Sequence, residues 1–192
     1  MKKDTPSFQF VGNDTSLDLV NTRVMTHGVV HDLINTDAGR AAWMAAAQLG
    51  PVANAWSDND NRQLQRLRDA IAQLVAAAID GSEAAAADMT IVNQHLGERT
   101  NAIHLTAQGA QFRLEEDKGP KSPDAVMGDI ADSAAHLLVE TNPKRLKRCA
   151  HPDCVLVFRD TSKSGRRRWC DMATCGNRAK VAAFRAGAGG AD

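Results

Sequence analysis

Long apolar runs, internal repeats and nucleotide-binding loops are all missing from this 192-residue sequence. No apolar stretch approaches the roughly 20 residues that a membrane-spanning helix requires. No glycine-rich phosphate loop and no nucleophile elbow occurs, so the two commonest sequence signatures of nucleotide hydrolysis and of α/β-hydrolase chemistry are absent. The lack of repeats and heptads excludes a solenoid or a coiled coil.

Aromatic residues make up only 4 % of the chain and tyrosine is absent, yet apolar residues reach 43 % and charged residues 24 %. That balance predicts a soluble globular fold with an ordinary core and room for a small appendage. Lys2 and Lys3 are not followed by an apolar run, so the start of the chain does not predict a signal peptide. We therefore expect a cytoplasmic protein without a membrane partner, whose thiols stay reduced.

The net charge is zero, but the charges are unevenly distributed along the chain. Residues 1–143 contain 11 Lys and Arg against 19 Asp and Glu, whereas residues 144–192 contain 12 against 4. The Asn142-Pro143 step coincides with the change of sign, and proline disfavours helical geometry in the residue before it. We predict an N-terminal domain at 1–143, a basic module at 144–186 and a disordered tail at 187–192. Either the basic module has an acidic partner elsewhere, or the two parts attract each other.

The predicted fold class is α+β and mostly α, because the N-terminal domain shows chiefly helical patterns. A short strand at 7–11 and a β-hairpin through 103–114, turning at Gly109, are the exceptions. Helices are predicted at 37–49, from a capping box at Ser57 and Asp60 to Gly81, at about 82–96, and from Ser122-Pro123 onward.

Four cysteines, Cys149, Cys154, Cys170 and Cys175, lie within 27 positions and form two C-x4-C pairs fifteen residues apart. Zinc takes four thiolates in a tetrahedron, and two tight turns that supply two ligands each suit that geometry. We predict structural Zn²⁺, because four thiolates leave no open coordination position for catalysis. The alternatives are two disulfides, replacement of one ligand by His151, and redox sensing by the same thiols.

The segments around the cysteines predict a treble-clef or ribbon-like zinc finger. A helix is expected after Cys175, with Val181 and Phe184 covering the zinc core. A β-hairpin is expected between the cysteine pairs, with a strand at 155–158, a turn at 162–165 and a return strand at 166–169.

Twelve cations surround the predicted metal site, and only three acidic residues oppose them before the tail. A small finger cannot bury or pair them all, so the phosphates of nucleic acid are the expected counter-charge. We predict that this face binds nucleic acid, DNA in preference to RNA. Trp169 either packs beside the zinc or stacks on a base. The candidate contact residues are Arg166, Arg167, Arg168, Asn177, Arg178, Lys180 and Arg185.

A second candidate site lies near the N-terminus. Asp18, Asn21 and Arg23 are predicted to line a polar pocket for a small-molecule effector; alternatively Asn21 caps a helix or satisfies buried backbone groups. His27 and His31 have the spacing of a metal-binding pair, but they lie in no helical pattern and lack the glutamate of a zincin. The sequence indicates no oligomeric state.

Residues 149–185 resemble the CGNR zinc finger, through Arg-Arg-Trp-Cys at 167–170 and Cys-Gly-Asn-Arg-Ala-Lys at 175–180. The preceding segment resembles the ABATE domain of bacterial stress-induced transcription regulators, through Phe8–Gly12 and Leu17–Thr22, with Asn13 where that family has a small residue or glycine. The resemblance implies a DNA-binding zinc finger and a ligand-sensing N-terminal domain. We expect a transcription regulator and not an enzyme; the alternative is an enzyme or small-molecule-binding protein whose finger is a structural or protein-docking module.

Overall fold

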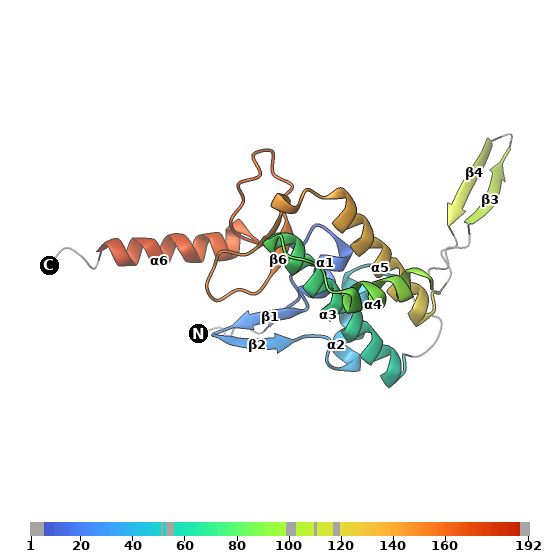
Figure 1. Cartoon of the computed structure of the whole chain (residues 1–192), viewed down its shortest axis with the longest axis horizontal. Helices are drawn as coiled ribbons and strands as arrows, with labels where there is room; N and C mark the ends of the chain where they lie inside the picture. Colours follow the sequence, from blue (N-terminus) through green and yellow to red (C-terminus); the bar gives the residue numbers. More distant parts are fainter. Residues whose placement is uncertain are drawn as a thin grey trace.

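The computed structural model describes residues 6–50, 52, 56–98, 103–109, 111–116 and 120–188 (Figure 1). Its centre is a helical bundle in which α3 (Asp58–Asp80) contacts α1 (Thr15–Val20), α4 (Ala86–Leu96) and α5 (Pro123–Glu140). A further helix, α2 (Asp37–Ala46), adds Trp43 and Met44 to the same core. The mostly helical N-terminal region is therefore confirmed. Within the described ranges, no helix combines the length and apolar character needed to cross a membrane.

The ends of α3 and α5 follow the predicted local signals. Ser57 and Asp60 form the capping box, because each side chain accepts a hydrogen bond from the backbone N–H of the other residue. Gly81 ends α3 in the left-handed region, at φ 66°, where glycine has no steric penalty. Ser122 caps α5, and Pro123 occupies its first turn. The apolar stripe of α3 is buried between these helices.

Two helices are shorter than predicted. α2 ends at Ala46 and not at Leu49, and Gln48 then takes a positive φ of 58°. α4 begins at Ala86 and not near Ser82, and its N-cap residue makes no side-chain hydrogen bond. An alanine run carries no capping side chain, so nothing in the sequence marks where this helix starts.

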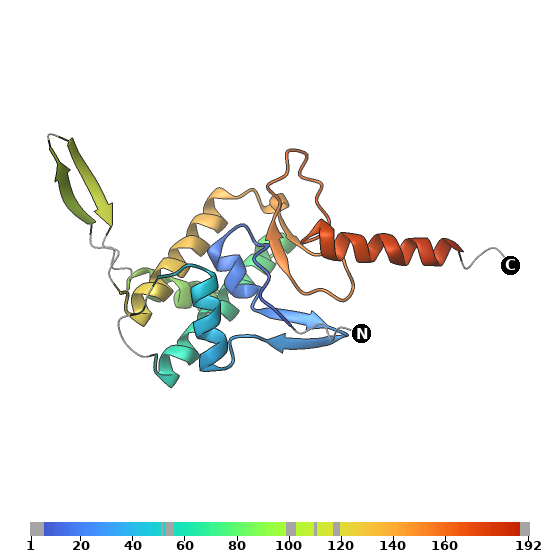
Figure 2. The same ribbon diagram turned by 180° about the vertical axis from the view of Figure 1, so that it is seen from behind.

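The strands form three separate two-stranded antiparallel hairpins. The predicted hairpin at Gly109 is confirmed, and it extends away from the helical bundle (Figure 2). The hairpin that turns at His27 and Gly28 was not predicted; both residues have positive φ, as a tight two-residue hairpin turn requires. The strands are β1 (Arg23–Thr26) with β2 (Val29–Asp32), β3 (Ile103–Gln108) with β4 (Gln111–Glu116), and β5 (Leu146–Arg148) with β6 (Val157–Arg159).

A buried arginine holds the β1–β2 hairpin on α3. The guanidinium of Arg68, 1 % exposed, donates two parallel hydrogen bonds to the carboxylate of Asp32, at 2.8 and 2.6 Å, and a third to Thr22 Oγ1 at 3.0 Å. Partial burial would raise the pKa of Asp32, but hydrogen bonding and charge from Arg68 outweigh it and lower that pKa. The bidentate pair therefore fixes where this hairpin leaves the bundle.

Two strand predictions were wrong. Residues 7–11 form no strand. At the edge of β6 that faces away from β5, the Asn21 side chain takes both backbone groups of Val157, and the carbonyl of Gly12 accepts a single hydrogen bond from the Arg159 N–H, at 3.1 Å. Residues 166–169 form no return strand, since β5, which precedes the first cysteine, takes that place. Local propensity marked the β-prone run correctly but could not identify its partner.

Asn13, which departs from the expected family pattern, sits where the chain turns toward β6. Its φ of 57° lies in the left-handed region, which asparagine tolerates better than most residues. Its side-chain amide donates to the Arg159 carbonyl at 3.2 Å, and its own carbonyl accepts from the Arg159 guanidinium at 2.8 Å. Asparagine thus supplies both the backbone geometry and one contact to the C-terminal module.

The C-terminal module packs directly on the N-terminal bundle. Asn21, 2 % exposed, accepts the Val157 N–H through Oδ1 and donates to the Val157 carbonyl through Nδ2, both at 2.9 Å. Leu146 of β5 belongs to the main helical core, and Arg148 forms a two-point ion pair with Asp80 at the end of α3. The side chain of Asn21 therefore completes the unpaired edge of β6 as another strand would.

We predict that Asn21→Ala destabilises the protein by about 2–4 kcal/mol, because it leaves both partly buried backbone groups of Val157 without partners. Urea denaturation followed by circular dichroism measures this change. Asn59→Ala, on the exposed first turn of α3, is the matched control and should change stability by less than about 0.5 kcal/mol. Equal effects of the two substitutions would contradict the role given to Asn21.

Candidate functional site: a four-cysteine metal centre and its basic face

Two tight turns bring the four cysteines together. Cys149 follows β5 and Cys154 precedes β6, and between them the Cys154 N–H donates to the carbonyl of His151 at 3.1 Å. Cys170 precedes a single π-helical turn at Met172–Gly176 that contains Cys175, and Asp171 caps this turn by accepting two backbone N–H bonds. Each pair therefore sits on a turn whose own hydrogen bonds fix it.

The sulfur atoms have the spacing of a tetrahedral metal site. All four Sγ atoms lie within 4.8 Å of one another, with Cys154 and Cys170 at 3.8 Å and Cys170 and Cys175 at 3.6 Å. Zn–S bonds of about 2.3 Å in a tetrahedron place sulfur atoms about 3.8 Å apart. In the described part of the chain, these cysteines are the one group of metal-binding side chains that converges. The residues fit the predicted Zn²⁺.

Several donors compensate the negative charge that four thiolates create. Arg178 donates from Nη2 to Cys175 Sγ at 3.1 Å, and the Cys170 N–H points at Cys149 Sγ, 3.4 Å away. A hydrogen bond from Cys170 lowers the pKa of the Cys154 thiol to about 5, while the same bond, with burial, raises the pKa of Cys170. Crowded thiols thus resist ionising together, and a divalent cation removes that conflict.

His151 does not take the place of a cysteine. Its Nδ1 accepts the N–H of Asp153 at 3.1 Å and so closes the first turn. The four converging cysteines already supply the four ligands of a tetrahedral zinc site, so no histidine ligand is needed.

A small apolar cluster surrounds the metal centre. Phe158 is fully buried, and Leu156 packs beside it with Val24 of β1, while Trp169 lies partly buried against the same group. The prediction that Val181 and Phe184 cover the zinc core was wrong, because α6 (Asn177–Ala188) projects away from it and leaves them 48 % and 77 % exposed (Figure 1). The N-terminal domain covers this cluster instead.

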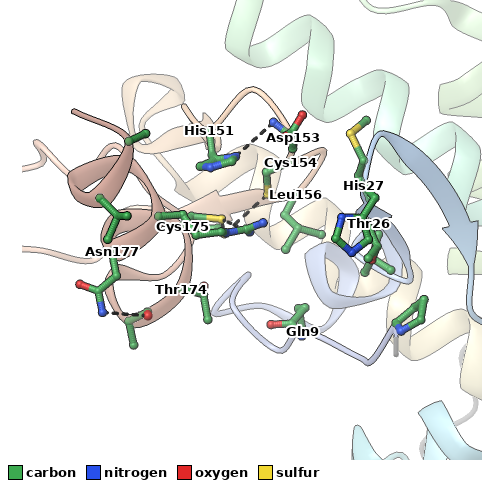
Figure 3. A pocket seen from close by; sticks show the side chains of 18 of the residues that line it. Gln9, Thr26, His27, His151, Asp153, Cys154, Leu156, Thr174, Cys175 and Asn177 are labelled. Atoms are coloured by element: carbon green, nitrogen blue, oxygen red, sulfur yellow. Dashed lines mark hydrogen bonds between the residues drawn. The ribbon is translucent and has the colours of Figure 1, made fainter. Parts of the chain in front are cut away.

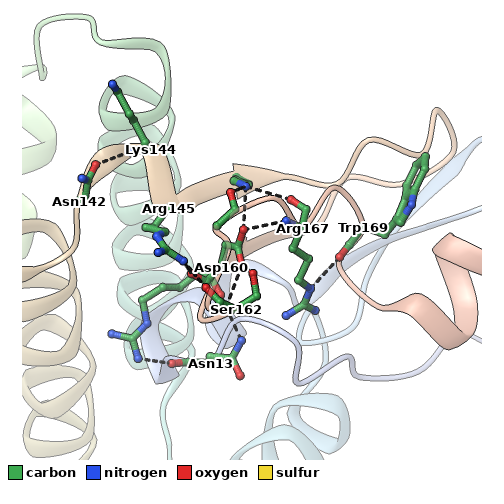
Figure 4. Close-up of polar contacts among 11 residues, drawn as sticks. Asn13, Asn142, Lys144, Arg145, Asp160, Ser162, Arg167 and Trp169 are labelled. Carbon is green, nitrogen blue, oxygen red and sulfur yellow. Dashed lines mark hydrogen bonds and ion pairs between the residues drawn. The ribbon is translucent and has the colours of Figure 1, made fainter.

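Asp160 organises the loop that carries the arginine run. Its buried carboxylate accepts hydrogen bonds from Lys147 Nζ at 2.8 Å, the Arg167 N–H at 2.9 Å and the Ser162 N–H at 3.0 Å (Figure 4). Burial alone would raise the pKa of Asp160, but these donors outweigh burial and hold it below its usual range. The loop from β6 to Cys170 is therefore fixed by an ionised carboxylate.

The structure separates the predicted nucleic-acid residues into two groups. Three are engaged in the fold: Arg167 donates to the carbonyls of Trp169 and Cys170, Arg178 faces a thiolate, and Asn177 donates to the carbonyl of Ala173. The other four, Arg166, Arg168, Lys180 and Arg185, are exposed and make no side-chain hydrogen bond or ion pair among the described residues; Asn177 and Arg178 are exposed as well, despite their contacts. Arg168 also stacks over Trp169, 5.0 Å from the ring centre.

The three residues predicted to bind an effector are each engaged in contacts within the fold. Asp18 Oδ1 accepts the Gly12 N–H at 2.9 Å, Asn21 pairs with β6, and Arg23 forms ion pairs with Asp69 and Asp32. His27 occupies the hairpin turn and His31 lies on β2, so they are not neighbours on a helix. Of the two alternatives for Asn21, the structure agrees with the one in which its side chain satisfies backbone groups.

A cleft of about 970 Å³ that the sequence did not predict lies beside the metal centre (Figure 3). The N-terminal segment and the end of β1 form one wall, and one face of α6 forms the other. These walls are about 150 residues apart in the sequence, so no local motif indicates that they meet. The one available signal was Gly28, because glycine readily adopts the positive φ that the β1–β2 turn requires.

We predict that Cys149→Ser lowers zinc affinity by more than about 100-fold. Losing a residue that only contacts a ligand lowers metal affinity by up to about 100-fold, and Cys149 is a ligand itself. Competition with a chromogenic chelator measures the affinity. His151→Ala is the matched control in the same turn and should retain zinc. A comparable loss in His151→Ala would show that the histidine, and not four sulfurs, completes the site.

We predict that the Asp18 carboxyl titrates near pH 6. Burial raises its pKa to about 6, the Gly12 N–H opposes this, and nearby Asp14 adds to it. A raised folded-state pKa means that stability from the protonated form is complete below about pH 4 and is lost as the pH rises through 6. Carboxyl ¹³C NMR should give this midpoint, and Asp18→Asn should abolish the matching decline in stability. A midpoint below 4 would contradict the assignment.

Comparison with known families agrees with this geometry. The CGNR zinc finger profile matches residues 145–187, and the ABATE profile, described as "Putative stress-induced transcription regulator", matches residues 13–141. No match is found among curated proteins. The ABATE match alone spans well over half of the chain, and the finger match contains all four clustered cysteines. The chain therefore belongs to the ABATE family of transcription regulators, with a CGNR zinc finger as its C-terminal module.

Proposed function

We propose that this transcription regulator binds DNA through the exposed cations of its zinc finger, and that its N-terminal domain senses a small molecule. The proposal of DNA binding rests above all on the cations of the C-terminal module that no acidic residue of the protein neutralises. The sensing part takes its support from the family resemblance, since Asp18, Asn21 and Arg23 are each engaged in the fold. A cytoplasmic location belongs to the same proposal, because zinc thiolates need reduced cysteines.

The acidic N-terminal domain does not neutralise the basic module. Among the described residues, one ion pair joins the two parts, between Arg148 and Asp80, and within the module Lys147 pairs with Asp160. Residues 144–188 contain twelve cations and three acids. A zinc ion with four thiolates adds two negative charges, which still leaves a strongly positive module. This excess favours an external polyanion over internal attraction.

The exposed cations lie on rigid supports. Arg166 and Arg168 belong to the loop fixed by Asp160, while Lys180 and Arg185 lie on α6, whose first turn carries Arg178, which donates to Cys175 of the metal centre. α6 carries no acidic residue and projects from the body of the protein (Figures 1 and 2). A projecting basic helix on a fixed base is a common means of entering the major groove.

We predict that wild-type protein binds duplex DNA with an affinity that falls steeply as salt rises. Arg166→Ala/Arg168→Ala should weaken binding about tenfold at 100 mM salt and reduce the slope of log K against log[salt] by about 2. Fluorescence anisotropy of a labelled duplex across a salt series measures both values.

Arg62→Ala/Arg66→Ala is the matched control, because it removes two exposed cations from α3 in the N-terminal domain. It should leave affinity and slope nearly unchanged. Weak binding without a salt slope, or equal losses in both double variants, would rule out the finger as the DNA-binding surface. Salt-insensitive binding of a protein partner would then favour the docking role for the finger.

A further inference from the structure

The cleft beside the metal centre joins the two parts of the chain at one surface. Gln9, Thr26 and His27 line it from the N-terminal domain (Figure 3). Arg178 and Arg185 line it from α6. A ligand in this cleft would contact both the zinc finger and the domain that precedes it. The chemistry of the two walls indicates what that ligand is.

The α6 wall is cationic. Residues 177, 178, 181, 182 and 185 of α6 line the cleft, so two of the helix's three cations face it and Lys180 does not. Arg178 uses Nη2 for Cys175, but a guanidinium has five N–H donors, so others remain for a ligand. Arg185 has no acidic partner among the described residues. An anionic ligand is therefore favoured on this side.

The opposite wall supplies hydrogen-bond donors without adding negative charge. Thr26 and His27 make no side-chain hydrogen bond within the described ranges, and the Gln9 amide contacts only neighbouring Ser7. Asp153, at the rim of the turn between Cys149 and Cys154, is the single carboxylate of the lining. Cys154, Cys170 and Cys175 also line the cleft, so the negative charge of the zinc–thiolate centre borders it, and Arg178, which donates to Cys175, offsets part of that charge. Threonine and glutamine side chains commonly contact phosphate and sugar oxygens.

We propose that this cleft holds the sugar–phosphate backbone of DNA, so that the N-terminal domain supplies half of the DNA interface. The proposal rests on the proposed DNA binding and extends it to the wall formed by Gln9, Thr26 and His27. α6 neutralises phosphates from one side, and these uncharged donors position the strand from the other. The charge of α6 and the two-walled shape together favour a polyanionic strand over a neutral partner.

The experiment uses the full-length zinc-loaded protein and the wall variant Gln9→Ala/Thr26→Val/His27→Gly. Valine keeps the β-branched shape of Thr26, and glycine suits the positive φ of His27, so both substitutions respect the hairpin. Val29→Thr/Val30→Thr is the control in the same hairpin, at exposed positions outside the cleft lining. Zinc content and far-ultraviolet circular dichroism confirm that each variant is folded.

At pH 8 the wall variant should bind duplex DNA about tenfold more weakly with an unchanged salt slope, because lost neutral donors release no counterions. Arg185→Ala should lower the slope by about 1, and the control should remain within about twofold of wild type. Wild-type binding by the wall variant, alongside weakened binding by Arg166→Ala/Arg168→Ala, would overturn the proposal and keep DNA on the finger alone. If the wild-type protein itself binds no DNA, that result contradicts the proposed function, and with it the cleft proposal that rests on it.

Amide NMR tests the location directly. Adding a 12-base-pair duplex should shift the amides of Thr26, His27 and Arg185 more than those of Val29 and Val30. Inorganic pyrophosphate is the competing small-anion probe. Shifts of the cleft amides with pyrophosphate but not with the duplex would assign the cleft to a small anion and overturn the proposal.

Discussion

Four thiolates must reach one point, and the C-terminal module is arranged around that requirement. Its own apolar core is small, with Phe158 and Leu156 as its buried side chains beside the cysteines. Such a segment buries too little apolar surface to order itself, so metal binding and folding are coupled. The turns at Cys149–Cys154 and Cys170–Cys175 then determine where β6 and α6 begin.

The same constraint gives the basic face a fixed orientation relative to the N-terminal domain. β5 and β6 form only a two-stranded hairpin, which is marginal by itself. The side chain of Asn21 satisfies one edge of β6, and Val24 of β1 covers the cysteine cluster. The module is therefore built into the bundle and is not tethered by a flexible linker. A change in the N-terminal domain can reach the finger through these contacts, which is what regulation of the finger requires.

The parts of the fold that could be predicted are those specified by neighbouring residues. The capping box at Ser57, the proline at the start of α5 and the four-cysteine spacing each need only a few positions to define a geometry. The partner of β6 could not be predicted, because β pairing joins distant segments and both Leu146–Arg148 and Arg166–Trp169 were compatible with it.

The same limit applies to the site. The sulfur ligands were predictable from spacing, whereas the inward roles of Arg167 and Arg178 depend on carbonyls and a thiolate that only the folded loop brings near. In a sequence, an arginine within a basic run has the same appearance whether it is available to bind phosphate or is hydrogen-bonded within the protein. The cleft could not be predicted either, because Gln9 and Arg185 line the same cleft only once the zinc finger is packed on the N-terminal domain.

The central claim is that four sulfur atoms from these two turns hold one zinc ion and thereby position the basic face. X-ray absorption spectroscopy at the zinc edge tests it most directly on the protein as purified. The account predicts a single shell of four sulfur atoms at about 2.3 Å. A shell that includes nitrogen or oxygen, or fewer than four sulfur atoms, would contradict it.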